Sequence, residues 1–128
     1  MTLNFAQIME LLNAIDELRD MKLPFKVSMI LAKNAKVLEA EKDFYIERER
    51  EFIQKYIEVD ENGQLVQQSE NVFKVREGME EECRDARQDL DTFTSELNLR
   101  KIPVSAIENM EFSPSQINAL EPIIDEEE

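Results

Sequence analysis

The sequence contains no histidine, one cysteine and only two glycines among its 128 residues. Without histidine it lacks the commonest general base and the commonest metal ligand. Cys83 alone cannot form an internal disulfide, and two glycines are too few for a phosphate-binding loop. Together these absences disfavour catalysis, and we expect a protein that is not an enzyme and that uses no cofactor or metal.

The chain also lacks long apolar stretches. It has no run of about 18 apolar residues, and its N-terminus does not have the basic-then-apolar layout of a signal peptide. We therefore expect a soluble intracellular protein that does not enter a membrane.

Positive charge is scarce in the later part of the chain. Residues 1–56 carry nine basic and ten acidic side chains, whereas residues 57–128 carry six basic and nineteen acidic ones. The net charge of −14 therefore comes almost entirely from the later part. Such a surface repels nucleic acid and anionic membrane and attracts basic proteins, so we expect a protein partner and no direct contact with nucleic acid.

One long helix is the main feature that is present. Residues 24–57 contain no glycine and no internal proline, and they are rich in good helix formers. At about 1.5 Å per residue this helix would extend for roughly 50 Å, whereas a compact chain of this size has a radius of gyration of about 14 Å. The sequence therefore predicts one elongated helical domain over residues 1–124.

Shorter elements flank the long helix. Asn4 and Gln7 form a capping pair for a helix over about 4–21, which we expect to lie antiparallel to the front half of the long helix. A heptad-like stripe predicts a third helix over about 78–98 along its rear half, with Cys83 as a core thiol. The members of this stripe are Met79, Cys83, Ala86, Leu90, Phe93 and Leu97.

The remaining segments predict small sheets and a short helix. The turn at residues 60–63 and two short apolar runs predict a β-hairpin over about 64–76, and Ile102 and Val104 are candidates for a third strand. Ser113 and Pro114 are a typical helix start. Residues 125–128 should be a disordered acidic tail. The predicted fold class is mainly α with some β (α+β): a long antiparallel helical hairpin, or a coiled-coil-like arrangement, with a small antiparallel sheet.

The front half of the long helix is apolar on more than one side. A stripe this wide indicates burial against more than one element, and either a second copy or the C-terminal segment could cover it. The acidic side chains of the third helix form the other candidate surface, because the heptad stripe turns them toward water. The predicted partner-binding residues are Val27, Ile30, Leu31, Val37, Glu81, Asp85 and Asp89.

The same acidic residues raise the question of a metal site. Glu77, Glu81 and Asp85 lie four residues apart, and Glu47 and Glu51 on the long helix could oppose them. Such a site requires the carboxylates to face the long helix, and the heptad stripe points most of them away from it. We therefore predict no metal site.

Several segments resemble small phage and prophage proteins of unknown function. They are Ala32-Lys33-Asn34, Asp60-Glu61-Asn62-Gly63, the helix with Leu90, Phe93 and Leu97, the Ile102 and Val104 segment, Phe112-Ser113-Pro114, and Ala119-Leu120-Glu121-Pro122. The likeness covers most of residues 25–124. It implies a viral setting, either in the host cytoplasm or in the virion, and it carries no known activity.

Two functions fit these observations. The first is an interaction or assembly module, which uses helical packing to form a homo-oligomer or to bind another phage or host protein. The second is an acidic inhibitor of a host nucleic-acid-binding or defence protein, in which the third helix and the tail imitate a phosphate backbone.

Overall fold

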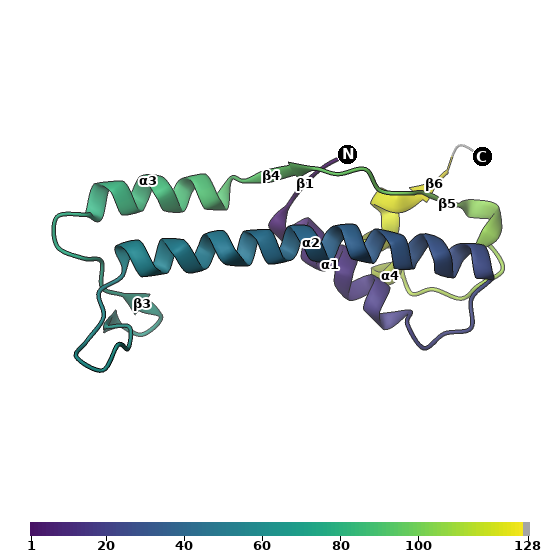
Figure 1. Cartoon of the computed structure of the whole chain (residues 1–128). Coiled ribbons are helices and arrows are strands. Elements are labelled where there is room, and N and C mark those ends of the chain that lie inside the picture. Colours follow the sequence, from purple (N-terminus) through teal and green to yellow (C-terminus); the bar gives the residue numbers. More distant parts are fainter. Residues whose placement is uncertain (127–128) are drawn as a thin grey trace. The chain divides into compact units, whose positions relative to one another are not determined.

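The computed structural model describes residues 1–126 and is mainly helical, with small sheets, as the sequence predicts (Figure 1). The α-helices are α1 (Phe5–Glu17), α2 (Phe25–Tyr56), α3 (Glu80–Asp91) and α4 (Pro114–Leu120). The strands are β1 (Thr2–Asn4), β2 (Gln67–Ser69), β3 (Val72–Phe73), β4 (Thr94–Glu96), β5 (Ile102–Pro103) and β6 (Ile124–Asp125). Two 3₁₀ turns, η1 (Val104–Ala106) and η2 (Glu121–Ile123), complete the list.

The chain forms two compact units. Unit 1 comprises residues 1–43 together with the described residues from 94 onward, and unit 2 comprises residues 44–93. Helix α2 contributes residues to both. The expectations of a single elongated domain over residues 1–124 and of a coiled coil remain predictions, and each unit is described by itself below.

Helix α2 has nearly the boundaries that its composition predicts. It begins at Phe25, directly after Pro24, and continues without a break to Tyr56. Ion pairs three residues apart join Arg48 to Glu51 at 3.2 Å and Arg50 to Glu47 at 3.5 Å. Each such pair stabilises a helix by a few tenths of a kcal/mol, so the continuity of α2 depends mainly on its helix-forming composition and on packing.

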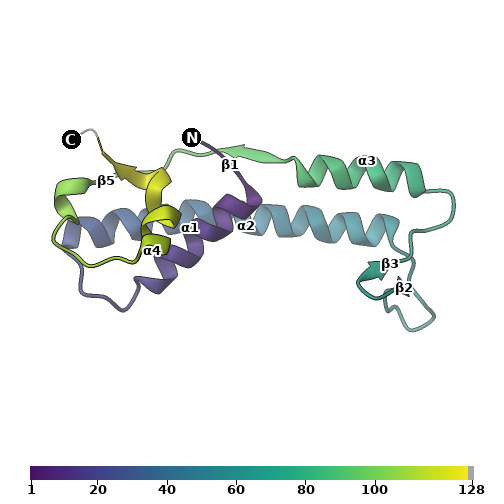
Figure 2. The same ribbon diagram turned by 180° about the vertical axis from the view of Figure 1, so that it is seen from behind.

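In unit 1, α1 and the C-terminal segment share one hydrophobic core with the front half of α2. The predicted capping box is present, since the Asn4 side chain accepts from the Gln7 amide and the Gln7 side chain accepts from the Asn4 amide, both at 2.9 Å. A second capping box joins Ser113 to Gln116 and opens α4, which packs against α1 (Figure 2). The buried core comprises Leu3, Ile8, Leu11, Ala14, Leu18, Val27, Ile30, Leu31, Leu38, Leu97, Ile102, Leu120 and Ile123.

Two strand pairs complete unit 1. Strand β1 pairs antiparallel with β4, and β5 pairs in parallel with β6. Between them the buried side chain of Asn34 makes two 2.8 Å hydrogen bonds to the backbone of Arg100, donating to its carbonyl and accepting from its amide. Asn34 therefore fixes the connection between β4 and β5 against α2.

Three predictions about where elements end or which segments pair are wrong. Helix α3 ends at Asp91 rather than near residue 98, because residues 94–96 pair with β1 and satisfy their backbone groups there. Ile102 pairs with Ile124 instead of joining the hairpin. Asp125, predicted to begin a disordered tail, is the last residue of β6, while residues 127–128 of that tail lie outside the described residues.

Unit 2 consists of α3, the rear part of α2 and a small β-structure. Helix α3 lies beside α2 and antiparallel to it, and both views agree (Figures 1 and 2). Its core comprises Phe52, Tyr56 and Cys83, with Ile53, Val75, Met79, Ala86 and Leu90 partly buried around them. The stripe that predicted this packing is confirmed from Met79 to Leu90, while Leu97 belongs to the core of unit 1.

The predicted hairpin is present as β2 and β3, and it forms part of a small closed structure that we call the β-knob (residues 57–75). Three backbone hydrogen bonds form a ring: Glu58 donates to Lys74, Lys74 to Val66, and Val66 to Glu58, at 2.8, 2.8 and 2.9 Å. The Asp60 side chain accepts from two turn amides, and Gly63 adopts a φ of 78°. Each of these three residues donates to one of the others and accepts from the other, so none of the three segments has an unpaired strand edge at this level.

Candidate functional site

The structure divides the predicted partner-binding residues into two groups. Val27, Ile30 and Leu31 are buried in the core of unit 1. Val27 and Ile30 present almost no surface to a partner, so this part of the prediction is wrong, whereas Leu31 lines a hollow beside α1. Their core cluster includes Leu120 and Ile123 of the C-terminal segment as well as residues of α1, and a C-terminal contribution is one of the two arrangements that the sequence left open. Val37 is partly exposed.

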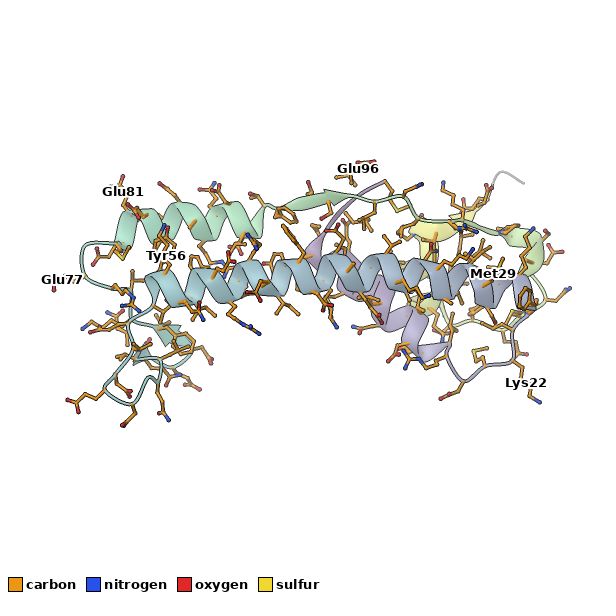
Figure 3. The ribbon with its side chains drawn as sticks, in the orientation of Figure 1. Lys22, Met29, Tyr56, Glu77, Glu81 and Glu96 are labelled. Carbon is orange, nitrogen blue, oxygen red and sulfur yellow. The ribbon has the colours of Figure 1, made fainter. Side chains whose placement is uncertain are left out.

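The acidic residues remain available. Glu81, Asp85 and Asp89 are all exposed on α3, and Glu81 points away from α2 (Figure 3). Of these three, Asp89 lines a hollowed part of the surface of unit 2. The structure therefore does not bring the two groups of predicted residues together.

The hollow is an open groove on unit 2 between α2 and α3, with a volume of about 350 Å³. Its lining residues follow one helical stripe on each helix, so that both stripes face the same side. From α2 they are Phe44, Arg48, Glu51, Phe52, Lys55 and Tyr56, and from α3 and its C-terminal extension they are Ala86, Asp89, Leu90 and Phe93. We call this surface the α2–α3 groove.

Four of the ten residues that line the groove are aromatic. Phe93 lies 6.2 Å from Phe44 and 6.5 Å from Tyr45, and Phe52 lies 5.2 Å from Tyr56, measured between ring centroids. Rings at these separations are within the range of favourable aromatic pairs. The Phe44 side chain is nevertheless 47% exposed, so one end of this aromatic row presents apolar surface to water.

Charged groups border the aromatic row. The Arg48 guanidinium lies 5.0 Å from the ring centroid of Phe44, and the Lys55 ammonium lies 5.2 Å from that of Tyr56. Both are within the range of cation–π contacts. The lining also contains Glu51 and Asp89, so its charged residues are two basic and two acidic ones.

Arg87 holds the two helices together beside the groove. Its guanidinium lies 5.2 Å from the Phe52 ring centroid and donates to Asp91, Glu49 and the Tyr45 hydroxyl. Burial alone would lower the pKa of Arg87, but the hydrogen bond and charge of Asp91, with Tyr45 and Glu49, outweigh it and raise the pKa. Arg87 therefore stays charged and fixes the relative position of the groove walls.

Cys83 lies in the core of unit 2 and not at the surface. Its side chain is a free thiol, and the residue is 7% exposed. Burial raises the pKa of the Cys83 thiol, and the positive charge of Arg87 opposes this only in part. At neutral pH the group is therefore a protonated core side chain rather than a nucleophile.

The β-knob carries a second set of exposed apolar side chains. They are Val59, Leu65, Val72 and Phe73. Scattered apolar residues on a surface are common, and these surround no groove among those found on the described residues.

Other kinds of site were sought over the same residues. Within residues 1–126, no three aspartate, glutamate or cysteine side chains come together in a way that could hold a metal ion. Nor does any helix in this range combine the length and the apolar character that crossing a bilayer requires. The chemistry that the α2–α3 groove offers is non-covalent binding of apolar groups between charged edges.

No match to this chain is found among protein-family models, curated proteins or solved structures. The α2–α3 groove must therefore be interpreted from its own geometry. Sequence reasoning predicted that the third helix packs along the rear half of the long helix, but it overlooked Phe44, which lines the groove. Phe44, Arg48 and Phe52 follow one another at intervals of four residues, which was the available signal, since residues four apart are neighbours on a helix surface.

Proposed function

We propose that this protein is a non-enzymatic interaction module that binds another protein chain through the α2–α3 groove. The observation that carries this proposal is the exposed aromatic end of the groove, where Phe44 and Phe93 lie beside Arg48. Aromatic and arginine side chains dominate the binding energy of protein interfaces, and charged groups at the edge provide orientation.

The viral setting implied by the resemblance gives this module its context. In that setting it would join phage proteins to one another during assembly, or bind a host protein in the host cytoplasm, or belong to the virion. Helical packing would provide the contact in each case, because both walls of the groove are helical.

An acidic inhibitor that imitates nucleic acid is the second candidate. The exposure of Glu81, Asp85 and Asp89 at four-residue intervals on α3 supports it, since that spacing places their carboxylates on one face. Binding of this kind would weaken steeply with salt, and reversing the three charges to lysine would abolish it. Binding through the groove would instead persist at high salt, because apolar contacts are not screened.

Photo-crosslinking tests the primary proposal with a matched control. Phe44 lines the groove and is 47% exposed, whereas Ile46 is 43% exposed and lies outside the lining. A photoreactive residue at position 44 should give a discrete protein adduct in cells that make the protein, and the same residue at position 46 should not. Equal adducts at both positions, or adducts from position 46 alone, would contradict the proposal.

A further inference from the structure

The two walls of the α2–α3 groove differ in charge. The α2 wall presents Arg48 and Lys55 with a single acid, Glu51, whereas the α3 wall presents Asp89 as its charged group. Helix α3 as a whole has six acidic and two basic side chains. Within residues 1–126, neither Lys55 nor Asp89 takes part in an ion pair. A complementary partner would place acidic groups opposite α2 and basic groups opposite α3.

A second copy of the same groove meets that requirement. We infer, on the basis of the proposed function, that the partner is a second copy of this chain, with α2 of each copy packed against α3 of the other. The charges of the groove lining cancel, although the chain carries −14 overall. The groove is thus a surface on which two acidic copies can approach each other without strong repulsion.

Symmetry restricts how the two grooves can meet. Two identical surfaces that face each other are related by a two-fold axis in the plane of contact. If that axis is perpendicular to the helices, α3 lies against α3, and two strongly acidic helices repel each other. If it is parallel to the helices, each α2 lies against the α3 of the other copy, which brings opposite charges together.

The parallel axis also fixes which residues face each other. Within one chain, Phe44 lies beside Phe93, and Arg87 reaches Glu49 at 3.4 Å. Arg48 therefore lies level with Asp89 along the helix pair. Rotation about an axis parallel to the helices keeps each residue at its level, so Arg48 faces Asp89 of the second copy. Phe44 in the same way faces Phe93 of the second copy, which extends the aromatic row across the contact.

The result is an antiparallel four-helix arrangement. Each helix is antiparallel to both of its neighbours, one in its own chain and one in the other. This is the topology of many four-helix bundles, and neighbouring helix dipoles are opposed in it. The contact is closed, because each copy uses its only α2–α3 groove, and the expected assembly is a dimer.

Charge reversal followed by mixing tests this arrangement. Arg48→Glu should place two repulsive contacts in its own dimer, and Asp89→Lys should do the same. Each variant alone should dissociate at least about tenfold more readily than the unmodified protein.

Mixing the two variants should restore the contact. In a mixed dimer the glutamate introduced at position 48 of one chain faces the lysine introduced at position 89 of the other. The second contact retains the original Arg48 and Asp89, so both contacts are attractive. A mixed dimer should therefore form in sedimentation experiments, with twice the 15.0 kDa mass of one chain.

A matched pair outside the groove provides the control. Arg50 forms an ion pair with Glu47, just as Arg48 does with Glu51, and Glu81 is exposed on α3. Neither Arg50 nor Glu81 lines the groove. Arg50→Glu and Glu81→Lys should leave the dimer as stable as before, alone or mixed. All four substituted positions are exposed, and circular dichroism of each variant verifies that it folds.

The outcomes separate this inference from the proposed function. An unmodified protein that sediments at 15.0 kDa at high concentration would overturn the dimer. If position 44 then gave an adduct with a different protein, the proposed interaction module would still be supported. A dimer that survives both groove variants, or that fails to recover on mixing, would overturn the pairing of α2 with α3. Recovery on mixing cannot come from an ion pair within one chain.

Discussion

The guanidinium of Arg87 lies 5.2 Å from the ring centroid of Phe52 and joins α3 to the rear part of α2. The same group donates to Asp91 on its own helix and to Glu49 on α2. One partly exposed arginine thus provides apolar contact through its stem and plane, and charge-assisted hydrogen bonds through its nitrogens. The walls of the groove depend on this residue.

Replacing Arg87 with methionine should loosen unit 2. The substitution keeps a long apolar stem but removes the hydrogen bonds to Glu49, Asp91 and Tyr45, and we expect a loss of about 1–2 kcal/mol in the free energy of unfolding. Urea denaturation followed by circular dichroism measures it. Arg84→Met, at an exposed position of the same helix, should change stability by less than about 0.5 kcal/mol. Equal effects of the two substitutions would contradict the role given to Arg87.

Replacing Asn34 with alanine should destabilise unit 1. Asn34 is 1% exposed and satisfies both the amide and the carbonyl of Arg100. Without it, two polar groups in a partly buried region lose their partners, at a cost of about 1–3 kcal/mol each. Hydrogen exchange of the Arg100 amide should accelerate at the same time. An Asn98→Ala variant is the control, because Asn98 is exposed, and it should leave both measurements nearly unchanged.

The Cys83 thiol should react slowly in the folded protein. Since burial raises its pKa, its thiolate should form at a higher pH than that of an unfolded cysteine. The rate of alkylation by iodoacetamide, measured against pH with and without urea, tests this. For the same reason the thiol contributes stability below the pKa of the unfolded chain, and that contribution is lost as the pH rises through the folded-state pKa. Rapid alkylation of the folded protein at neutral pH would show that Cys83 is accessible.

Local signals in the sequence predicted the elements that depend on neighbouring residues. The Asn4 and Gln7 capping box, the Ser113 and Pro114 helix start, and the turn with Gly63 each have their cause within a few residues. The long helix followed from the absence of glycine and internal proline over residues 24–57. These features need no information about the rest of the chain.

Features that depend on distant pairing were missed. Leu97 continues the spacing of the α3 stripe, yet residues 94–96 form a strand because their partners are residues 2–4. Ile102 pairs with Ile124, and no local pattern indicates that choice. Tertiary contacts override local propensity at each of these positions.

The α2–α3 groove was only partly predictable. The spacing of apolar residues predicted the helical stripe that packs α3 on α2, and with it the exposure of Asp89. It did not indicate that Phe44, beside the buried Tyr45, would line a groove, because the boundary between buried and exposed faces depends on where the second helix lies. A difference of one residue on a helix is about 100° around its axis.

The most direct test of the central claim compares the mass of two variants with that of the unmodified protein by sedimentation equilibrium. Phe44→Gln removes the exposed aromatic side chain of the groove, whereas Ile46→Gln removes a similarly exposed apolar side chain of the same helix outside it. We predict that Phe44→Gln shifts the mass toward the 15.0 kDa of one chain and that Ile46→Gln leaves the dimer intact. Persistence of the dimer in both variants, or its loss in both, would contradict the claim that the two copies meet at this groove.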